Sequence, residues 1–214
     1  MRLLLPKLYV ILDAALLTTP EKDGAWRLAD VGVRLLQYRN KQASARELLH
    51  TSRELSGLLR PRGVSFIVND RPDVAFLSGA DGVHVGQEDL EVEQTRTLAG
   101  PGKWVGISTH NLAQFCAAAA TSADYIAVGP IFSTSTKVNP DPVVGTDFIR
   151  QVRRLTDKAI VAIGGITLDR AAGVIEAGAD AVAVGSDVLR AANPGARARQ
   201  YIDMLEAANH AAAV

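Results

Sequence analysis

The sequence predicts a (β/α)8 TIM barrel that forms a single domain over residues 1–214. Eight short runs rich in Val, Ile and Leu each precede a segment of helical character, and such uninterrupted apolarity is typical of strands covered on both faces. At about 27 residues, each strand and helix unit is close to the lower size limit for this barrel. An open doubly wound sheet is the alternative. Against it, the Gly-x-Gly-x-x-Gly signature is absent after the first run, and polar residues follow nearly every run.

The predicted strands are spaced along the whole chain. They are residues 8–12, 33–38, 64–68, 82–85, 104–107, 125–128, 159–163 and 181–184. Between them, residues 45–60, 111–120 and 170–178 have the composition of helices, and Gly178 is a typical helix stop. No low-complexity linker or change of composition divides the chain, so we expect one domain.

The charge balance argues against nucleic acid as a partner. Lys plus Arg and Asp plus Glu both total 23, so the chain has neither an overall basic field nor an acidic tail. Pro6, Lys7 and Asp13 interrupt the apolar start, which is too short for a membrane span and lacks a convincing cleavage site. We therefore expect a soluble, unprocessed protein with no membrane partner, in which any anion site is local.

The single cysteine, Cys116, excludes an intramolecular disulfide framework and fits a reducing cytoplasm. It lies in the apolar run 114–120, where we expect it to be a small, buried or half-buried hydrophobic side chain. A homo-oligomer stays open, because an apolar helix face that packs on the barrel has the same pattern as one that packs on a partner.

The carboxyl ends of barrel strands open onto one face, where the active site lies. After the second predicted strand, the alternation of Gln37, Arg39 and Lys41 places all three on one side of an extended backbone. Convergent Arg and Lys favour a polyanion such as diphosphate, because each charge-assisted hydrogen bond contributes on the order of 1.5–3 kcal/mol. A salt-bridged rim is the alternative interpretation.

Two carboxylates, Asp70 and Asp89, follow consecutive strands and therefore lie side by side at the same rim. Mg²⁺ in proteins takes one or two carboxylates and keeps several waters, so the pair is suited to this ion. The alternatives are a cap for Asp70, on a helix that begins at Pro72, and a solvated loop charge for Asp89. His84 has no second His or Cys at ligand spacing, which favours a core or hydrogen-bonded histidine over a zinc ligand.

The later strand ends are rich in hydroxyls and glycine. Thr134 and Thr136 offer two hydroxyls beside the Lys137 ammonium. Gly164–Gly165 and Gly185–Ser186 close the last two strands, where barrels often bind phosphate on bare backbone N–H groups. These glycines have turns as their alternative role, and Ser108 and Asn111 are both candidate helix caps.

As a set, these motifs resemble the thiamine phosphate synthase family. The resemblance runs in order through LYVILD (8–13), QYRNK (37–41), IVNDRPDVA (67–75), ADGVHVGQEDL (80–90), VGISTH (105–110), ADYIAVGPIFSTSTK (123–137), AIGGI (162–166) and VAVGS (182–186). It implies a (β/α)8 barrel that joins a hydroxymethylpyrimidine diphosphate to a thiazole phosphate and releases diphosphate. It also implies an ionisation mechanism, in which the diphosphate leaves first and the thiazole nitrogen captures the resulting cation.

The resemblance implies a role for each matching residue. The pyrimidine diphosphate would be bound by Gln37, Tyr38, Arg39, Asn40, Lys41, Asn69, Ser108 and Lys137. The thiazole phosphate would be bound by Thr134, Ser135, Thr136, Gly165, Gly185 and Ser186, and Mg²⁺ by Asp70 and Asp89. Of these, Arg39, Lys41, Ser108 and Lys137 would act in catalysis. Two positions depart from the family pattern, since Asn40 stands where an acidic residue is common and Gly185 where a bulkier apolar residue is common.

Two rival functions share this barrel. A thiazole tautomerase-like relative would use His110 as its acid–base group, but it has no diphosphate to expel. It therefore does not need the full set of charged residues, which are Lys41, Asp70, Asp89 and Lys137. A non-catalytic barrel that binds thiamine phosphate is expected to lose the carboxylates or Lys137 while it retains the glycines. The complete set of charged residues therefore favours the synthase.

Overall fold

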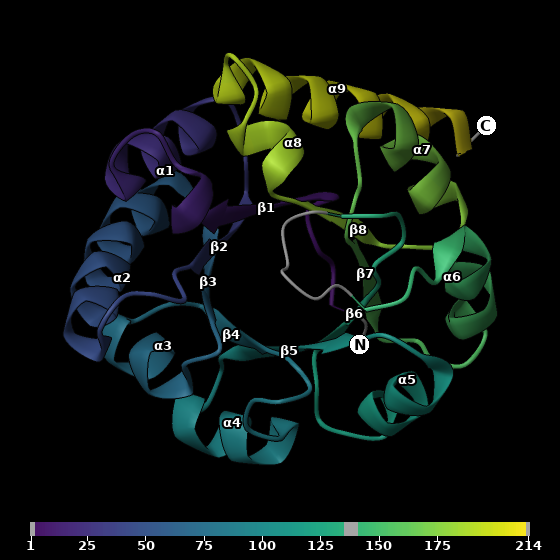
Figure 1. The fold of residues 1–214 in the computed structure, drawn as a ribbon, viewed down its shortest axis with the longest axis horizontal. Coiled ribbons are helices and arrows are strands. Elements are labelled where there is room, and N and C mark those ends of the chain that lie inside the picture. Colours follow the sequence, from purple (N-terminus) through teal and green to yellow (C-terminus); the bar gives the residue numbers. More distant parts are fainter. Residues whose placement is uncertain (1–2, 135–140, 213–214) are drawn as a thin grey trace.

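The computed structural model describes residues 3–134 and 141–212, and side-chain positions are described up to residue 207. Eight parallel strands close into a barrel in the order of the sequence, as Figure 1 shows end-on. The strands are β1 Leu8–Asp13, β2 Leu35–Arg39, β3 Ser65–Asn69, β4 Gly82–Val85, β5 Trp104–Thr109, β6 Tyr125–Val128, β7 Ala159–Ile163 and β8 Ala181–Val184. The predicted fold class is confirmed.

The described helices surround the barrel and cover its outer face (Figure 1). They are α1 Glu21–Asp30, α2 Ala45–Leu59, α3 Pro72–Ser78, α4 Val92–Ala99, α5 Leu112–Ala119, α6 Gly145–Arg153, α7 Leu168–Glu176, α8 Ser186–Leu189 and α9 Pro194–Ala212, with 3-10 turns η1 Ala14–Leu16 and η2 Arg60–Arg62. None of the helices in the described ranges combines the length and apolarity that a membrane span requires.

All eight predicted strands are present, and four of them extend beyond the predicted carboxyl end. They end at Asp13, Arg39, Asn69 and Thr109. These additional residues are polar, and their strand pairing continues past the apolar run because the barrel backbone, not the side chain, makes the ladder bonds. The last strand positions therefore hold several of the predicted site residues in fixed register.

The core has two parts, as a closed barrel requires. An outer layer of aliphatic side chains packs between the strands and the helices, and a smaller cluster fills the interior of the barrel. The interior cluster includes two tyrosines, Tyr9 and Tyr125, whose rings pack edge to face with centroids 6.1 Å apart. This interior layer forms the floor beneath the active-site end.

Cys116 corrects one expectation, because its side chain is exposed rather than buried or half-buried. The buried residues of α5 are Phe115 and Ala118. Cys116 follows Phe115 by one residue, which is about 100° around the helix, so it faces solvent. The run of alanines gave no polar residue to mark which face of this helix is covered.

Candidate active site

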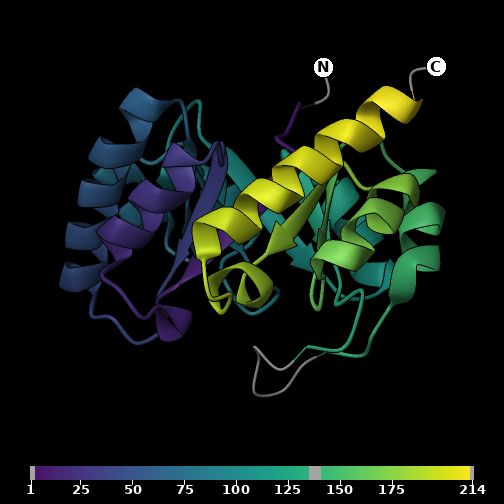
Figure 2. The same cartoon turned by 90° about the horizontal axis from the view of Figure 1, so that it is seen from above.

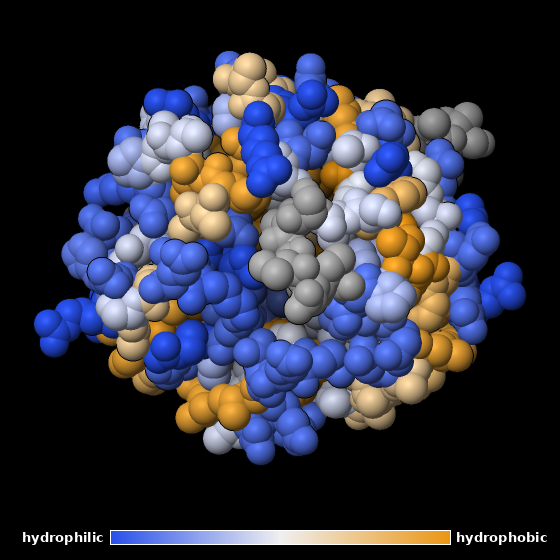
Figure 3. All heavy atoms as spheres, viewed as in Figure 1, coloured by the Kyte–Doolittle hydropathy of each residue, from blue (hydrophilic) through white to orange (hydrophobic). Residues whose placement is uncertain are grey.

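The carboxyl ends of the strands meet at one end of the barrel, which we call the mouth. Figure 2 shows η1, which directly follows β1, and α8, which follows β8, at this end, while α9 finishes at the other. Figure 3 views the mouth from outside, and hydrophilic residues gather to the left of its centre and below it. Two cavities open here, one of about 150 Å³ and one of about 660 Å³, and both are lined by Asp13 and Arg39.

Arg39 is held in place by Asp13, the last residue of β1. Arg39 Nη1 donates to Asp13 Oδ2 at 2.5 Å, and the two residues are register partners in the β1–β2 ladder. The Asp13 side chain is almost fully buried, and its other oxygen accepts the Ala15 N–H at 3.0 Å. Sequence reasoning did not assign Asp13 a role in the site, although a carboxylate at a strand end was the signal that identified Asp70.

Lys41 and Asp70 form the second ion pair of the mouth, with Lys41 Nζ bonded to Asp70 Oδ2. Asp70 has a positive φ of 63°, and its backbone N–H donates to the His84 carbonyl at 2.7 Å. Helix α3 begins at Pro72 as expected, but its N-cap residue is Arg71 and no side chain caps it. The alternative interpretation of Asp70 as a helix cap is therefore wrong, because its left-handed backbone turns the carboxylate toward Lys41.

Asp89 lies beside Asp70 and accepts the Gly86 N–H on Oδ2 at 2.7 Å. Burial raises the pKa of Asp70 above its ordinary value, and the neighbouring Asp89 carboxylate raises it further, while Lys41 opposes both effects. The pair therefore concentrates negative charge that the protein compensates only in part.

A divalent cation fits this pair. Two adjacent carboxylates, one of them costly to ionise, offer the oxygen ligands that Mg²⁺ takes alongside water and phosphate. Within residues 3–134 and 141–207, no group of three or more His, Cys, Asp or Glu side chains is placed to hold a metal. The remaining ligands would then come from water or from a substrate.

The pyrimidine-side residues divide between the interior and the exterior of the barrel. Gln37 is buried in the interior and donates to Tyr9 Oη at 2.8 Å, and Asn69 is the register partner of His84. Tyr38 points outward between β2 and the helices, where its hydroxyl donates to Glu21 at 3.1 Å. Tyr38 could therefore contact a ligand inside the mouth only through its backbone.

His84 and Ser108 are bonded to each other, with His84 Nε2 2.9 Å from Ser108 Oγ. The prediction of a buried, hydrogen-bonded histidine at position 84 is confirmed. Asn111 caps α5 by accepting the Gln114 N–H at 3.0 Å, whereas Ser108 lies inside β5 and does not cap a helix.

The glycines that directly follow β7 and β8 line the smaller cavity. Gly165 has a positive φ of 64°, and a Cβ at this position would lie 2.4 Å from the Ser133 carbonyl oxygen, so a side chain is excluded there. Gly185 and Ser186 line the same cavity with Thr134. A Cβ on Gly185 would meet its nearest atom at 3.5 Å, which is ordinary contact. Ser135, Thr136 and Lys137 lie outside the described residues.

His110 also lines the smaller cavity. Its Nδ1 lies 2.6 Å from the Gly129 carbonyl oxygen, so this nitrogen carries the proton and donates it, while Nε2 faces Asp141 Oδ2 at 3.5 Å.

Comparison with known proteins places this geometry in a family. A model described as "Thiamine monophosphate synthase" matches residues 8–188. The chain belongs to the thiamine monophosphate synthase family. Among relatives, it is 50% identical over 210 residues to a thiamine-phosphate synthase of Koribacter versatilis, covering 94% of this chain and 96% of that one. It is 45% identical over 195 residues to one of Chloroflexus aurantiacus, with 91% and 90% covered.

A solved structure supports the same assignment. The chain is similar to thiamine phosphate pyrophosphorylase from Pyrococcus furiosus, with a TM-score of 0.86, 32% identity, and 94% of this chain and 96% of that one covered. The resemblance stated from the motifs is confirmed. Both relatives are named thiamine-phosphate synthases, which favours the synthase over the tautomerase-like and non-catalytic rivals.

The two departures from the family pattern have a structural explanation. Asn40 Oδ1 accepts the N–H groups of Gln42 and Ala43, each at 3.1 Å, so it organises the turn after β2. An acidic residue would accept the same two bonds. At Gly185, a Cβ would make only ordinary contact, so the backbone there does not require glycine.

Proposed function

We propose that the protein is a thiamine phosphate synthase. It joins 4-amino-2-methyl-5-(diphosphooxymethyl)pyrimidine to a thiazole phosphate, carboxylated or not, and releases diphosphate. The carboxylated form also loses carbon dioxide to give the same product, thiamine phosphate. The observation that carries this proposal, beside the family, is the arrangement of Arg39, Lys41 and the Asp70–Asp89 pair at one mouth. At the mouth, the two cationic side chains and the proposed cation site lie close together, where they would contact the departing diphosphate.

The chemistry needs a stabilised leaving group more than a strong base. The bond between the methylene carbon and the diphosphate oxygen breaks, and the diphosphate keeps the electron pair. The thiazole nitrogen then donates its lone pair to the methylene carbon, so the new C–N bond forms without a proton transfer. Electrostatic clamps on the departing anion contribute about 3–4 kcal/mol for each donor group.

Arg39 and Lys41 bind the diphosphate at the mouth, beside Asp70, and act on the leaving group. Asp13 fixes the Arg39 guanidinium by a buried ion pair, so the guanidinium is already oriented when substrate arrives. Lys41 has an exposed side chain and bonds to Asp70, which leaves its ammonium at the edge of the larger cavity. We assign the same role to Lys137, which lies outside the described residues.

The two rings occupy different parts of the mouth. Gln37, Asn69 and Ser108 bind the pyrimidine over the interior of the barrel, with contributions from the backbone of Tyr38 and Asn40. The smaller cavity takes the thiazole phosphate on the backbone of Gly165 and Gly185 and on the hydroxyls of Thr134 and Ser186, and we add Ser135 and Thr136 from the sequence.

Asp70 and Asp89 hold Mg²⁺ in this proposal. The bound ion would neutralise charge on the departing diphosphate. The two carboxylates meet the requirement for oxygen ligands, and the like charge of Asp89, which with burial raises the pKa of Asp70, supports a cation at this position. We also place the enzyme in the cytoplasm, because its substrates are small phosphorylated metabolites and its chain has one cysteine.

The direct test is to mix the purified protein with both phosphorylated precursors and Mg²⁺. We expect stoichiometric thiamine phosphate and diphosphate, and we expect a chelator to stop their formation. If neither product forms while the thiazole carboxylate phosphate isomerises, the tautomerase-like rival is correct and the proposal is wrong.

A further inference from the structure

Five hydrogen-bonded side chains cross the interior of the barrel beneath the mouth, and we call them the interior chain. Gln37 Nε2 donates to Tyr9 Oη at 2.8 Å, and Tyr9 Oη lies 3.1 Å from Tyr125 Oη. His84 continues the series, with Nδ1 3.1 Å from Tyr125 Oη and Nε2 2.9 Å from Ser108 Oγ. Its two ends belong to the proposed pyrimidine subsite, whereas the three residues between them have no assigned role.

The interior chain is built into the packing of the barrel. Tyr9 and Tyr125 are each 1% exposed, and the His84 ring stacks on Tyr125 with centroids 5.5 Å apart. Gly106 makes the space for the Tyr125 ring, because a Cβ at position 106 would lie 2.0 Å from Tyr125 Cζ. These side chains therefore have little freedom to take other hydrogen-bond partners.

The hydrogen bonds along the interior chain all run in one direction from donor to acceptor. Burial raises the pKa of Tyr9 and Tyr125 above their ordinary values, so each hydroxyl keeps its single proton. Because Tyr9 accepts from Gln37, it donates to Tyr125, the hydroxyl next to it, and Tyr125 donates to His84 Nδ1. A neutral His84 then carries its proton on Nε2 and donates it to Ser108.

Because of this direction, one end of the interior chain offers a hydrogen-bond donor to the mouth and the other end offers an acceptor. Ser108 Oγ accepts from His84, so its own proton is available to donate into the mouth. Gln37 Oε1 is an acceptor with no partner among the described residues, and it is not one of their fully buried unpaired polar atoms. If the Gln37 amide turned over, each donor along the interior chain would reverse, and both ends would change together.

We propose that the interior chain sets the hydrogen-bonding polarity of the pyrimidine subsite, with Ser108 as donor and Gln37 as acceptor, and thereby selects a 4-aminopyrimidine over a 4-oxopyrimidine. This inference rests on the proposed function, because it assigns Tyr9, Tyr125 and His84 as positioning residues for that substrate. None of the three needs to touch the reacting atoms.

The chemistry of the two rings explains the selection. A 4-aminopyrimidine places an amino N–H donor beside a ring nitrogen acceptor, which matches one acceptor and one donor from the protein. A 4-oxopyrimidine places a carbonyl acceptor beside a ring N–H, which is the inverse pattern. Binding the oxo ring would require the Gln37 amide to turn over and the three intervening groups to reverse with it. Otherwise it leaves polar groups of the site unpaired.

Tyr125→Phe breaks the interior chain in its middle and keeps the ring. For this variant we expect the preference in kcat/KM for the 4-amino over the 4-oxo diphosphate substrate to fall by about tenfold or more, the effect of roughly one net hydrogen bond. The different intrinsic ionisation of the two rings cancels when variant and wild type are compared. Tyr201→Phe removes a buried hydroxyl elsewhere, from a bond to Asp187 Oδ2, and should keep the wild-type preference. An unchanged preference in Tyr125→Phe would overturn the inference.

A second measurement does not depend on turnover. The ¹⁵N shifts of the His84 ring in the wild-type protein, assigned with the His84→Gln variant, report which nitrogen is protonated. We expect a neutral ring with the proton on Nε2, and a proton on Nδ1 would contradict the proposed direction. Failure of the wild type to couple either pyrimidine would reject the proposed function, whereas the ring shifts would still decide the polarity.

Discussion

The two ends of the barrel use aspartate in opposite ways. At the amino end, Asp81, Asp124 and Asp180 stand directly before β4, β6 and β8, in the repeated motif Ala-Asp-x-(Val/Ile)-x-Val. Each carboxylate accepts a backbone N–H at the start of the preceding strand, at 2.7–2.8 Å, and each Asp N–H donates back to the same residue's carbonyl. At the mouth, Asp13 is paired in a similar way with Arg39 and a backbone N–H, but Asp70 and Asp89 lie against each other.

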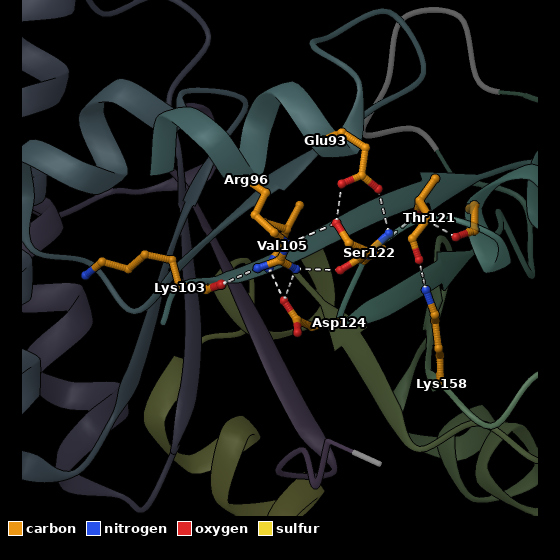
Figure 4. Close-up of polar contacts among 10 residues, drawn as sticks. Glu93, Arg96, Lys103, Val105, Thr121, Ser122, Asp124 and Lys158 are labelled. Atoms are coloured by element: carbon orange, nitrogen blue, oxygen red, sulfur yellow. Dashed lines mark hydrogen bonds and ion pairs between the residues drawn. The ribbon is translucent and has the colours of Figure 1, made fainter. Parts of the chain in front are cut away.

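Arginine completes the pairing of two of these aspartates, as Figure 4 shows for Asp124. Arg96 donates to Asp124 Oδ2 at 2.7 Å and to the carbonyls of Ser122 and Lys103. Arg153 bonds to Asp180 at 3.0 Å in the same way. Carboxylates whose lone pairs are used by the protein's own donors hold strands together, whereas Asp70 and Asp89 lie against each other, where we propose that they hold a cation. In TIM barrels the amino end serves stability and the carboxyl end activity, and here the difference lies in carboxylate pairing.

The largest effect should come from removing a mouth carboxylate. For Asp89→Ala we expect Mg²⁺-dependent coupling to fall by about 1000-fold or more, because half of the proposed cation site is lost, while the urea midpoint stays close to that of wild type. Single-turnover kinetics and urea unfolding measure the two quantities. Glu88→Ala, at the exposed neighbouring residue, is the matched control and should retain activity. Unchanged turnover in Asp89→Ala would remove Asp89 from the metal assignment.

Asp13→Asn tests whether a buried carboxylate of the mouth acts through Arg39. The amide can still accept the Ala15 N–H, but it loses the charge that orients the guanidinium. We expect kcat/KM for the pyrimidine diphosphate to fall by about 100-fold with little change in stability. Asp13→Glu, which keeps the charge, should recover part of the loss, and equal losses in both variants would argue against an electrostatic role.

At the amino end, Asp124→Ala should lower stability and leave activity unchanged. It leaves the Val105 N–H and the Arg96 guanidinium without this partner, so we expect a loss of about 2 kcal/mol in the free energy of unfolding. Turnover at temperatures where the variant is folded should match that of wild type. The control is Asp147→Ala, whose ion pair with Arg150 is exposed and whose loss should change the free energy by less than about 0.5 kcal/mol. A loss of activity in Asp124→Ala without unfolding would break the distinction between the two ends.

The smallest of these expected effects is a change in stability at Asp70, whose raised pKa lowers the free energy of unfolding at neutral pH. Folding raises this pKa above 3.8, so the folded state binds the proton more tightly, and the resulting stability is present at low pH and lost as the pH rises through the raised value. Asp70→Asn should therefore be more stable than wild type at pH 7 by about 1 kcal/mol, although inactive. Asn also tolerates the positive φ.

Urea unfolding of Asp70→Asn and wild type over a pH series measures this difference. The gain should shrink as the pH falls through the raised pKa and should vanish below 3.8, where wild-type Asp70 is protonated in both states. A gain that is constant with pH would show that charge is not its cause.

Much of this account was accessible from the sequence because strands covered on both faces read as apolar runs. A polar residue directly after such a run, such as Asp70 or Lys41, is then at the mouth. The hydrogen-bond and ion-pair partners of these residues were harder to predict from the sequence. That Asp13 meets Arg39 depends on the register between β1 and β2, and no local pattern gives that register.

The interior of the barrel was also missed, for a related reason. Tyr9 and Tyr125 were counted within apolar strands, and apolarity alone does not show which side chains face inward. The repeated Ala-Asp motif is visible in the sequence, but its partners lie 15 to 20 residues away. The helix-cap role considered for Asp70 failed because a single left-handed residue, which no pattern marks, reoriented its side chain.

The most direct measurement is a crystal structure of the protein with inorganic diphosphate and Mn²⁺ as an anomalous substitute for Mg²⁺. We predict an anomalous peak between the Asp70 and Asp89 carboxylates, with the diphosphate contacting Arg39 and Lys41. A peak at the amino end of the barrel, or a diphosphate bound without metal at the mouth, would contradict the assignment of the two ends.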